Sequence, residues 1–168
     1  MSPTIPTAPT DGGAASPAGP DRSRVSEPGR RVVRAGVGDA VVSAAALADE
    51  VEDPAAGAVV TFAGVVRDHD GGRAVAGIEY VAHPGAGAVV TEVAEDIAAR
   101  FPVDAVAVVH RVGTLAVGDV ALGVAVAAAH RGEAFAALTE LVEEVKRRLP
   151  VWKRQVFPDG THEWTGSA

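Results

Sequence analysis

The chain contains no cysteine, which narrows its chemistry before any motif is considered. Without a thiol it forms no disulfide, offers no thiolate ligand to a metal, and carries neither a cysteine nucleophile nor a persulfide. Aromatic residues are also scarce, with one Tyr and four Phe, and the formal net charge is -7. An acidic chain with few stacking side chains argues against nucleic-acid binding.

Several common functional segments are missing as well. No run of about 18 uncharged apolar residues exists, so we expect no membrane span. The phosphate-loop pattern GxxxxGK[ST] and the hydrolase pattern G-x-S-x-G are absent, and Ser43 is the only serine between residues 32 and 164. The stretch PGAGA (84–88) precedes a predicted helix, but Val90 stands where a dinucleotide-binding loop needs its third glycine.

The first 31 residues differ in composition from the rest of the chain. They hold six prolines, with Gly, Ala, Ser and Thr between them, and almost no large apolar residues. Such a segment buries too little surface to offset its ordering entropy, so we predict a disordered tail over 1–31 and one domain over 32–168. The tail lacks the apolar core of a signal peptide and is too acidic for a transit peptide, which favours a cytoplasmic location.

Hydrophobic periodicity predicts an α+β domain. Strands are expected at 31–35, 57–67, 74–82, 103–112 and 120–129, and helices at 39–51, 88–101 and 132–149. Asp39 is the expected cap of the first helix, and Gly64 indicates a bulge or a close backbone approach. The turn at Asp70-Gly71-Gly72 predicts that 74–82 returns beside 57–67 as a hairpin. Strand 120–129 is almost wholly apolar, so we expect both of its faces to be covered.

The last predicted helix is amphipathic. Its expected buried residues are Phe135, Leu138, Leu141, Val142, Val145 and Leu149. Glu143 with Arg147 and Glu144 with Arg148 have the spacing of supporting ion pairs. A proline follows the helix, and proline cannot continue it.

A cationic cluster lies at and after the end of this helix. Five of the chain's 15 Lys and Arg residues fall within Lys146 to Arg154. In an acidic chain this clustering indicates an anionic ligand, and lysine also offers an amine that can act as a nucleophile or base. The alternative is structural: Lys146 would complement the helix dipole, and Lys153 would be solvated on the face opposite a buried Trp152.

Three further polar groups are candidates for a binding or metal site. His130-Arg131 precedes the last helix, where free backbone N–H groups and an arginine suit a phosphate, although a plain loop pair is the alternative. Asp68-His69-Asp70 is a faint metal-like cluster, but the glycines after it favour a solvated hairpin. His110 is expected at an exposed strand end.

Four stretches together resemble the large, catalytic subunit of molybdopterin synthase. They are GAVVTFAGVVRDH (57–69), VVHRVGTLAVGD (108–119), AAHRGEAF (128–135) and VKRRLPVWKRQ (145–155). The resemblance covers Gly57 to Trp164, and its most specific part is a His-Arg pair, a helix and then K-x-x-x-P-x-W-K.

This resemblance implies an α/β-hammerhead fold with an additional antiparallel β-sheet. It also implies a homodimer that docks two copies of a small ubiquitin-like sulfur carrier, giving a heterotetramer. The carrier ends in Gly-Gly with a C-terminal thiocarboxylate, whose sulfur is transferred to cyclic pyranopterin monophosphate to form molybdopterin. No tightly bound cofactor and no metal are implied, and the absence of cysteine fits because the sulfur arrives on the partner.

The resemblance also assigns residue roles. Lys146 and Lys153 fall on the two active-site lysines. Lys146 would lie nearest the carrier's terminal glycine as a base or transient acyl acceptor, while Lys153 would hold anionic groups. The substrate-contacting positions are Val65, Val66, Arg67, His130, Arg131, Arg154 and Gln155, with the His-Arg pair on the phosphate.

Three positions depart from the family pattern. Gln155 stands where the family often has a glutamate, Val65 where some members carry a lysine, and His83 where a tyrosine before proline is common. Gln155 removes a charge beside the expected site, which bears on substrate affinity. Two other functions fit part of the sequence. One is a non-catalytic module that binds a phosphorylated molecule or the carrier; the other is a phosphate-ester hydrolase, for which a metal cluster or serine nucleophile is lacking.

Overall fold

The computed structural model describes residues 24–166, so most of the predicted tail (1–23) lies outside the described residues. In chain order the elements are β1 (Arg31–Gly38), α1 (Ala44–Glu50), β2 (Ala58–Val65), β3 (His69–Asp70), β4 (Arg73–Ala74), β5 (Gly77–Ala82), α2 (Ala86–Arg100), β6 (Val103–Arg111), β7 (Gly113–Ala116), β8 (Val120–Ala128), α3 (Arg131–Arg148), β9 (Val151–Val156) and β10 (His162–Thr165). None of the helices in this part of the chain is long and apolar enough to span a membrane.

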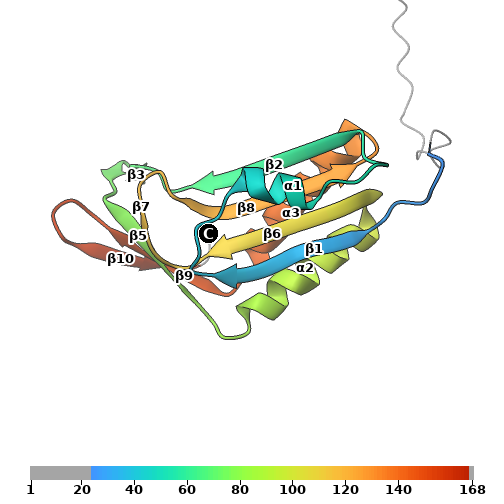
Figure 1. The fold of residues 1–168 in the computed structure, drawn as a ribbon. Coiled ribbons are helices and arrows are strands. Elements are labelled where there is room, and N and C mark those ends of the chain that lie inside the picture. The colour runs from blue at the N-terminus through green and yellow to red at the C-terminus, as the bar shows by residue number, and fades with distance from the viewer. Residues whose placement is uncertain (1–23, 167–168) are drawn as a thin grey trace, which may run out of the picture.

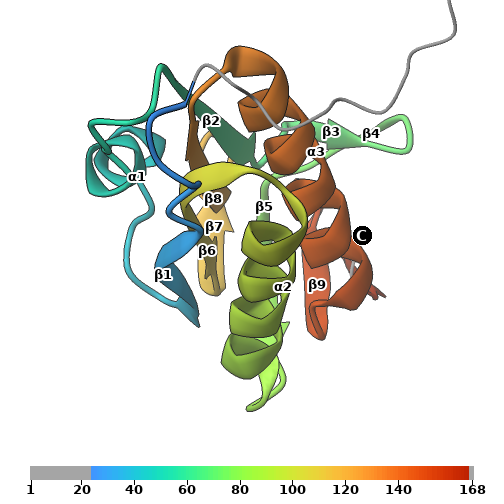
Figure 2. The same cartoon turned by 90° about the vertical axis from the view of Figure 1, so that its right-hand side faces the viewer.

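The first sheet has the strand order β1-β6-β8-β2 and forms the centre of the molecule (Figure 1). The pair β1–β6 is parallel, and the other pairs are antiparallel. Figure 2 shows α1 on one face of this sheet and α2 and α3 on the other. β8 is buried from Ala121 to Ala128. The prediction that both faces of this strand are covered is therefore confirmed.

A second, fully antiparallel sheet has the order β10-β9-β5-β7 and lies at one end of the first. The predicted α+β class with an additional antiparallel sheet is confirmed. The predicted hairpin of 57–67 with 74–82 is wrong. β3 and β4 form a separate small hairpin whose turn glycines, Gly71 and Gly72, have φ of 53° and 79°. The chain then crosses into the second sheet, where β5 pairs with β7 and β9.

The first helix begins later than predicted. Ser43, not Asp39, is its N-cap, and the Ser43 hydroxyl accepts a hydrogen bond from the Ala46 N–H at 3.2 Å. The preceding segment is held by packing, because Val42 is buried against Gly123 of β8. A Cβ at Gly123 would lie 2.4 Å from Val42 Cγ1, so this strand position needs a glycine for the segment to sit on the sheet.

Helix α3 follows the prediction closely, with one error in its buried face. Phe135 is 58% exposed, because it lies beside the expected stripe rather than in it. Glu144 pairs with Arg148 as predicted, at 3.8 Å, and also accepts a hydrogen bond from Arg147 at 2.5 Å. The His130 N–H donates to Glu133 at 3.3 Å, which closes the first turn of the helix.

The described residues just before β1 are tied to the domain. Arg24 forms an ion pair with Asp104, whose side chain is 1% exposed, and the Gly29 N–H donates to the same carboxylate at 3.3 Å. Arg30 Nη1 donates to the carbonyls of Ala98 (2.8 Å) and Phe101 (3.0 Å) at the end of α2. Contacts with the domain therefore start at Arg24, earlier than the predicted boundary at residue 32.

We predict that Arg24→Ala lowers the free energy of unfolding by about 1–3 kcal/mol, because it leaves a buried carboxylate without its charged partner. Urea denaturation followed by circular dichroism measures this change. The matched control is Arg34→Ala, which breaks a pair with Glu50 whose side chains are 50% and 35% exposed. Exposed pairs contribute about 0.2–1 kcal/mol, so equal losses in the two variants would contradict the prediction.

Candidate active site

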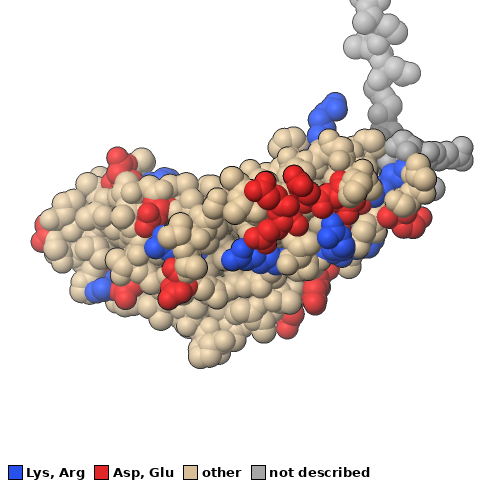
Figure 3. Space-filling view, viewed as in Figure 1, with Lys and Arg blue, Asp and Glu red and all other residues tan. Residues whose placement is uncertain are grey.

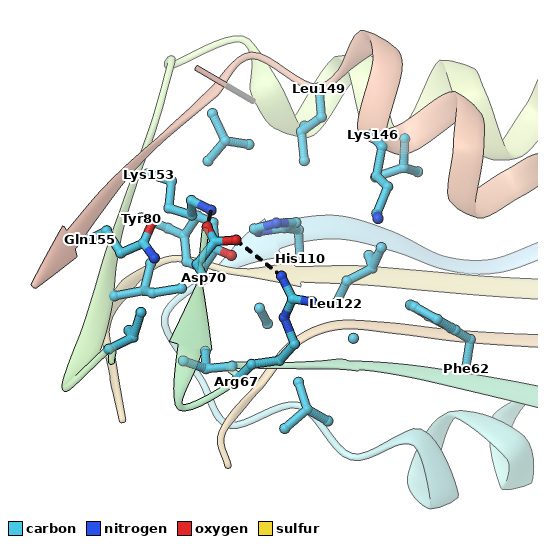
Figure 4. Close-up of a pocket in the computed structure, with 18 of the residues that line it drawn as sticks. Phe62, Arg67, Asp70, Tyr80, His110, Leu122, Lys146, Leu149, Lys153 and Gln155 are labelled. Atoms are coloured by element: carbon cyan, nitrogen blue, oxygen red, sulfur yellow. Dashed lines mark hydrogen bonds and ion pairs between the residues drawn. The ribbon is translucent and has the colours of Figure 1, made fainter. Parts of the chain in front are cut away.

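A cavity of about 320 Å³ lies where the end of β2, the last turn of α3 and the inner face of the second sheet meet (Figure 4). This volume suits a small molecule or the end of an extended peptide. Apolar and polar side chains line it together. The polar and charged residues that line the cavity are Arg67, His69, Asp70, Tyr80, His110, Lys146, Lys153 and Gln155.

Lys146 reaches the cavity from α3. It lies in the last turn of the helix, between the buried residues Val145 and Leu149, which also line the cavity. Figure 4 shows its ammonium group pointing into the cavity, on the side away from Asp70. The side chain therefore has a position from which it can meet a ligand, in addition to its favourable place at a helix C-terminus.

Alternation along β9 decides which of its side chains reach the cavity. Val151, Lys153 and Gln155 line it, whereas Trp152 is 45% exposed on the other face. The predicted alternation is correct, but the prediction that Trp152 belongs to the core is wrong. The face opposite Lys153 is the outer face of the second sheet. Arg154 lies on that outer face too, and its Nε donates to Glu79 at 2.6 Å.

Asp70 joins two of the cations in the cavity. Its Oδ2 accepts from Lys153 Nζ at 3.3 Å, and its Oδ1 accepts from Arg67 Nη2 at 3.2 Å. Hydrogen bonds from Lys153 and then Gln155, followed by the charge of Lys153, lower the pKa of this carboxyl. Asp70 is therefore ionised at neutral pH and shares its charge between two cationic side chains.

Tyr80 and His110 form the inner end of the cavity. Their rings meet edge to face with centroids 5.1 Å apart. Burial raises the pKa of Tyr80, and the nearby charge of Asp70 raises it further. His110 is 9% exposed and its Nδ1 is buried without a hydrogen-bond partner, so the prediction of an exposed strand end is wrong. Burial lowers the pKa of His110, which keeps the ring neutral.

The end of β2 supplies the remaining wall. Val65, Val66 and Arg67 all line the cavity. The predicted irregularity at Gly64 is confirmed, because the pairing of β2 with β8 shifts register between Gly64 and Val65. After the shift, Val66 is anchored by the hydrogen bond from its N–H to the Asp119 carbonyl at 2.9 Å. This bulge turns the chain so that Arg67 reaches Asp70.

Three of the nine predicted site residues do not line this cavity within one chain. Arg154 faces the other side of the second sheet. His130 and Arg131 are exposed at the N-terminal end of α3, while Lys146 lies in its last turn. Sixteen residues at 1.5 Å each separate His130 from Lys146 by about 24 Å along the helix.

Four polar residues that line the cavity were not selected from the sequence. His69 and Asp70 were assigned to a solvated hairpin, His110 was assigned to an exposed strand end, and Tyr80 belongs to no pattern that marks a site. No spacing rule links them to the lysines, because three different elements bring them together. The only sequence signal was the presence of His69 and His110 within the stretches that carry the family resemblance, with Asp70 directly after the first of them. Among the described residues, no group of three or more His, Cys, Asp or Glu residues has the arrangement of a metal site.

The sequence of this chain is similar to that of several known proteins. The profile of the family described as "MoaE protein" matches residues 37–148. The molybdopterin synthase catalytic subunit of Nostoc sp. is 40% identical over 121 residues, covering 71% of this chain and 72% of that protein. The protein of the same name from Aspergillus clavatus is 44% identical over 112 residues, covering 66% of this chain and 57% of that protein. The chain thus spans little more than half the length of this fungal relative.

Solved structures give the same result. The crystal structure of molybdopterin synthase from Staphylococcus aureus matches with a TM-score of 0.73 at 28% identity, covering 79% of this chain and 96% of that one. The fold and the cavity define an α+β protein with a lysine-lined pocket between two sheets. The chain belongs to the MoaE family, as its resemblance in four sequence stretches predicted.

The buried histidine makes stability depend on pH. Because burial holds the pKa of His110 below its usual 6.5, the unfolded chain binds the proton more readily than the folded chain. The free energy of unfolding should therefore fall as the pH drops below about 6.5. We predict that the free energy of unfolding of His110→Phe falls less between pH 7.5 and 5.5 than that of the unmodified protein.

Urea titrations at the two pH values measure this difference. His162→Phe is the control, since it makes the same substitution at an exposed histidine on β10, outside the cavity. The same fall in the His110→Phe variant and the unmodified protein would show that His110 does not titrate as inferred.

Proposed function

We propose that this chain is the catalytic subunit of a molybdopterin synthase. In this role it transfers sulfur from the C-terminal thiocarboxylate of a small ubiquitin-like carrier to cyclic pyranopterin monophosphate. The observation that carries the proposal is the meeting of Lys146, Lys153 and Arg67 on one cavity of an acidic chain. Both reactants are anionic, so cations on a concave, partly apolar surface would concentrate and orient them.

The charge distribution is consistent with a local pocket rather than a broad basic surface. On the face in Figure 3, acidic and basic side chains are interspersed, with an acidic patch over α1 beside basic side chains over β1. Arg31 pairs with Asp53 and Arg34 with Glu50 in this region. Three cations gathered around one cavity, on a chain whose exposed arginines in this region pair with acids, favour a small anion over an extended polyanion.

The cavity residues have different roles in the proposed reaction. The carbon–sulfur bond of the thiocarboxylate breaks, the sulfur forms a bond to a side-chain carbon of the pterin precursor, and the oxygen substituent of that carbon leaves. A dithiolene requires two such transfers, so two thiocarboxylates are consumed for each product. The glycine carbonyl carbon ends as a carboxylate after reaction with water, either directly or after a transient amide with Lys146 Nζ. Lys153 and Arg67 would hold the anionic groups in place, and the buried wall around Tyr80 and His110 would limit access of water.

We predict that Lys146→Ala and Lys153→Ala each reduce turnover about tenfold or more, because each removes a positioned cation and Lys146 also removes the amine. The assay mixes the purified chain with a thiocarboxylated carrier and cyclic pyranopterin monophosphate, and quantifies the dithiolene pterin. Arg147→Ala is the matched control: it changes a neighbouring cation in the same helical turn that pairs with Glu144 and does not line the cavity.

The result separates the proposal from its alternatives. A rate near that of the unmodified protein for Lys146→Ala would contradict the role of this residue. Absence of product from the unmodified chain, despite demonstrated binding of the carrier, would favour a non-catalytic binding module. Lys146→Ala that binds the carrier normally but turns over slowly would support the enzyme.

We also propose that two copies of the chain combine and that each contributes to the other's site. The resemblance assigns His130 and Arg131 to the substrate phosphate, yet a helix length separates them from Lys146 in one chain. Both assignments hold together only if the pair meets the cavity of a second copy. A two-fold axis would make the exchange reciprocal, and one carrier per cavity would give the heterotetramer.

Mixed dimers test this arrangement. We predict that Lys146→Ala and Arg131→Ala chains, each slow alone, regain activity when co-expressed, because a mixed dimer contains one site with both residues intact. About a quarter of the unmodified activity is expected from random pairing of the two chains. Rates that remain at the level of the separate variants, with mixed dimers confirmed by affinity tags, would contradict the shared site.

A further inference from the structure

The Asp70 carboxylate is placed where an anionic ligand would be expected. Each of its two oxygens contacts a different cation of the cavity, Lys153 at 3.3 Å and Arg67 at 3.2 Å. Gln155, which is 4% exposed, lies beside the same carboxylate (Figure 4). An ammonium, a guanidinium and an amide together form a donor set that suits a planar carboxylate.

The element that carries Asp70 is a small hairpin outside both large sheets. Strands β3 and β4 have two residues each and, among the described residues, pair only with each other. Gly71 and Gly72 form the turn between them with positive φ. A two-stranded hairpin of this size is not stable by itself. Its base is anchored, because Val75 is buried and the Ala76 N–H donates to the Val156 carbonyl at 2.8 Å, whereas the position of its tip depends on side-chain contacts.

Those contacts lie on two sides of the hairpin. Asp70 faces the cavity, whereas Arg73 donates to Glu163 at 2.5 Å and stacks over Phe157 with its guanidinium carbon 3.5 Å from the ring centroid. The donors Lys153 and Gln155 belong to β9, which is paired on both edges by β5 and β10. If the contact between Asp70 and its donors opens, the hairpin is therefore the part that moves.

We propose that Asp70 occupies a carboxylate-binding subsite of the cavity, and that it gives way when the carboxylate of a ligand takes the same donors. The identity of that ligand rests on the function proposed above: it is the C-terminal carboxylate or thiocarboxylate of a peptide ending in Gly-Gly. In the unliganded chain Asp70 neutralises Lys153 and Arg67. In the liganded chain the incoming group neutralises them, and Asp70 moves toward solvent.

Binding to the chain alone tests this subsite without the sulfur-transfer reaction. The probe is a fluorescent pentapeptide with a free C-terminal Gly-Gly carboxylate, and its C-terminal amide is the uncharged reference. Asp70→Asn should bind the carboxylate peptide about five- to tenfold more tightly than the unmodified chain, because the tethered competitor is removed. Asp68→Asn is the matched control, since it removes one carboxylate charge two residues away from Asp70. Among the described residues the Asp68 carboxylate pairs with His69, and Asp68 does not line the cavity.

Several results would overturn the proposal. They are unchanged or weaker binding of the carboxylate peptide by Asp70→Asn, an equal gain in Asp68→Asn, an equal gain for the amide peptide, or no measurable binding of the carboxylate peptide by Asp70→Asn. A gain for inorganic phosphate without a gain for the peptide would also overturn it, because the subsite would then fit phosphate. Thermal melting of each variant checks that the fold is intact.

Movement of the hairpin gives a second, independent readout. Saturating the unmodified chain with the carboxylate peptide should speed amide hydrogen exchange at 71–74, while exchange in β8 stays slow. Unchanged or slower exchange at 71–74 would show that Asp70 stays in place. Because neither experiment requires product formation, the subsite can fail while the enzyme assay succeeds, and the reverse.

Discussion

The fold depends on the burial of β8 on both faces. Its alternating residues differ in size: Ala125 and Ala127 face the small core beneath α1, while Val124 and Val126 face the larger core beneath α2 and α3. Small side chains on one face, with Gly123 among them, let the short helix and its preceding segment pack closely. Since β8 is flanked by β6 and β2, this two-sided packing fixes the register of both neighbours. The end of β2 is thereby placed opposite the last turn of α3, where the cavity forms.

The short link after α3 converts that arrangement into a site. Pro150 ends the helix, and its carbonyl accepts a hydrogen bond from the His83 N–H at 3.0 Å, which starts the pairing of β9 with β5. Two walls of the cavity therefore come from one continuous stretch of chain. The helix presents Lys146 and the strand presents Lys153, only seven residues later in the sequence. Their convergence needs no long-range coincidence, because a helix that stops at a proline and returns as a strand folds back over its own last turn.

Much of this could be predicted from the sequence, and the failures share a cause. Periodicity located the three helices and the long strands, and the buried strand 120–129 was recognised from its composition alone. Alternation also paired Lys153 with Val151 correctly, but period two does not say which face is solvent, so Trp152 was assigned to the core. The same limit affected Phe135 at the edge of a helical stripe and His110 at a strand end. Strand 74–82 was assigned to the wrong partner because turn signals describe local geometry, whereas the second sheet is built from β5, β7, β9 and β10, which are distant in sequence.

The position of negative charge in the cavity sets what it can bind. The family resemblance places a glutamate where this chain has Gln155, on a strand that is hydrogen-bonded on both edges. A carboxylate there would be fixed beside Lys153. In this chain the amide at 155 leaves Asp70 as the carboxylate against that lysine, and Asp70 belongs to a hairpin outside both large sheets. In the proposed displacement, the net charge presented by Arg67 and Lys153 depends on where the hairpin lies, not on the sequence count alone. An acidic protein would in this way offer a cationic site to an anionic ligand, while Asp70 keeps these two cations paired when no ligand is bound.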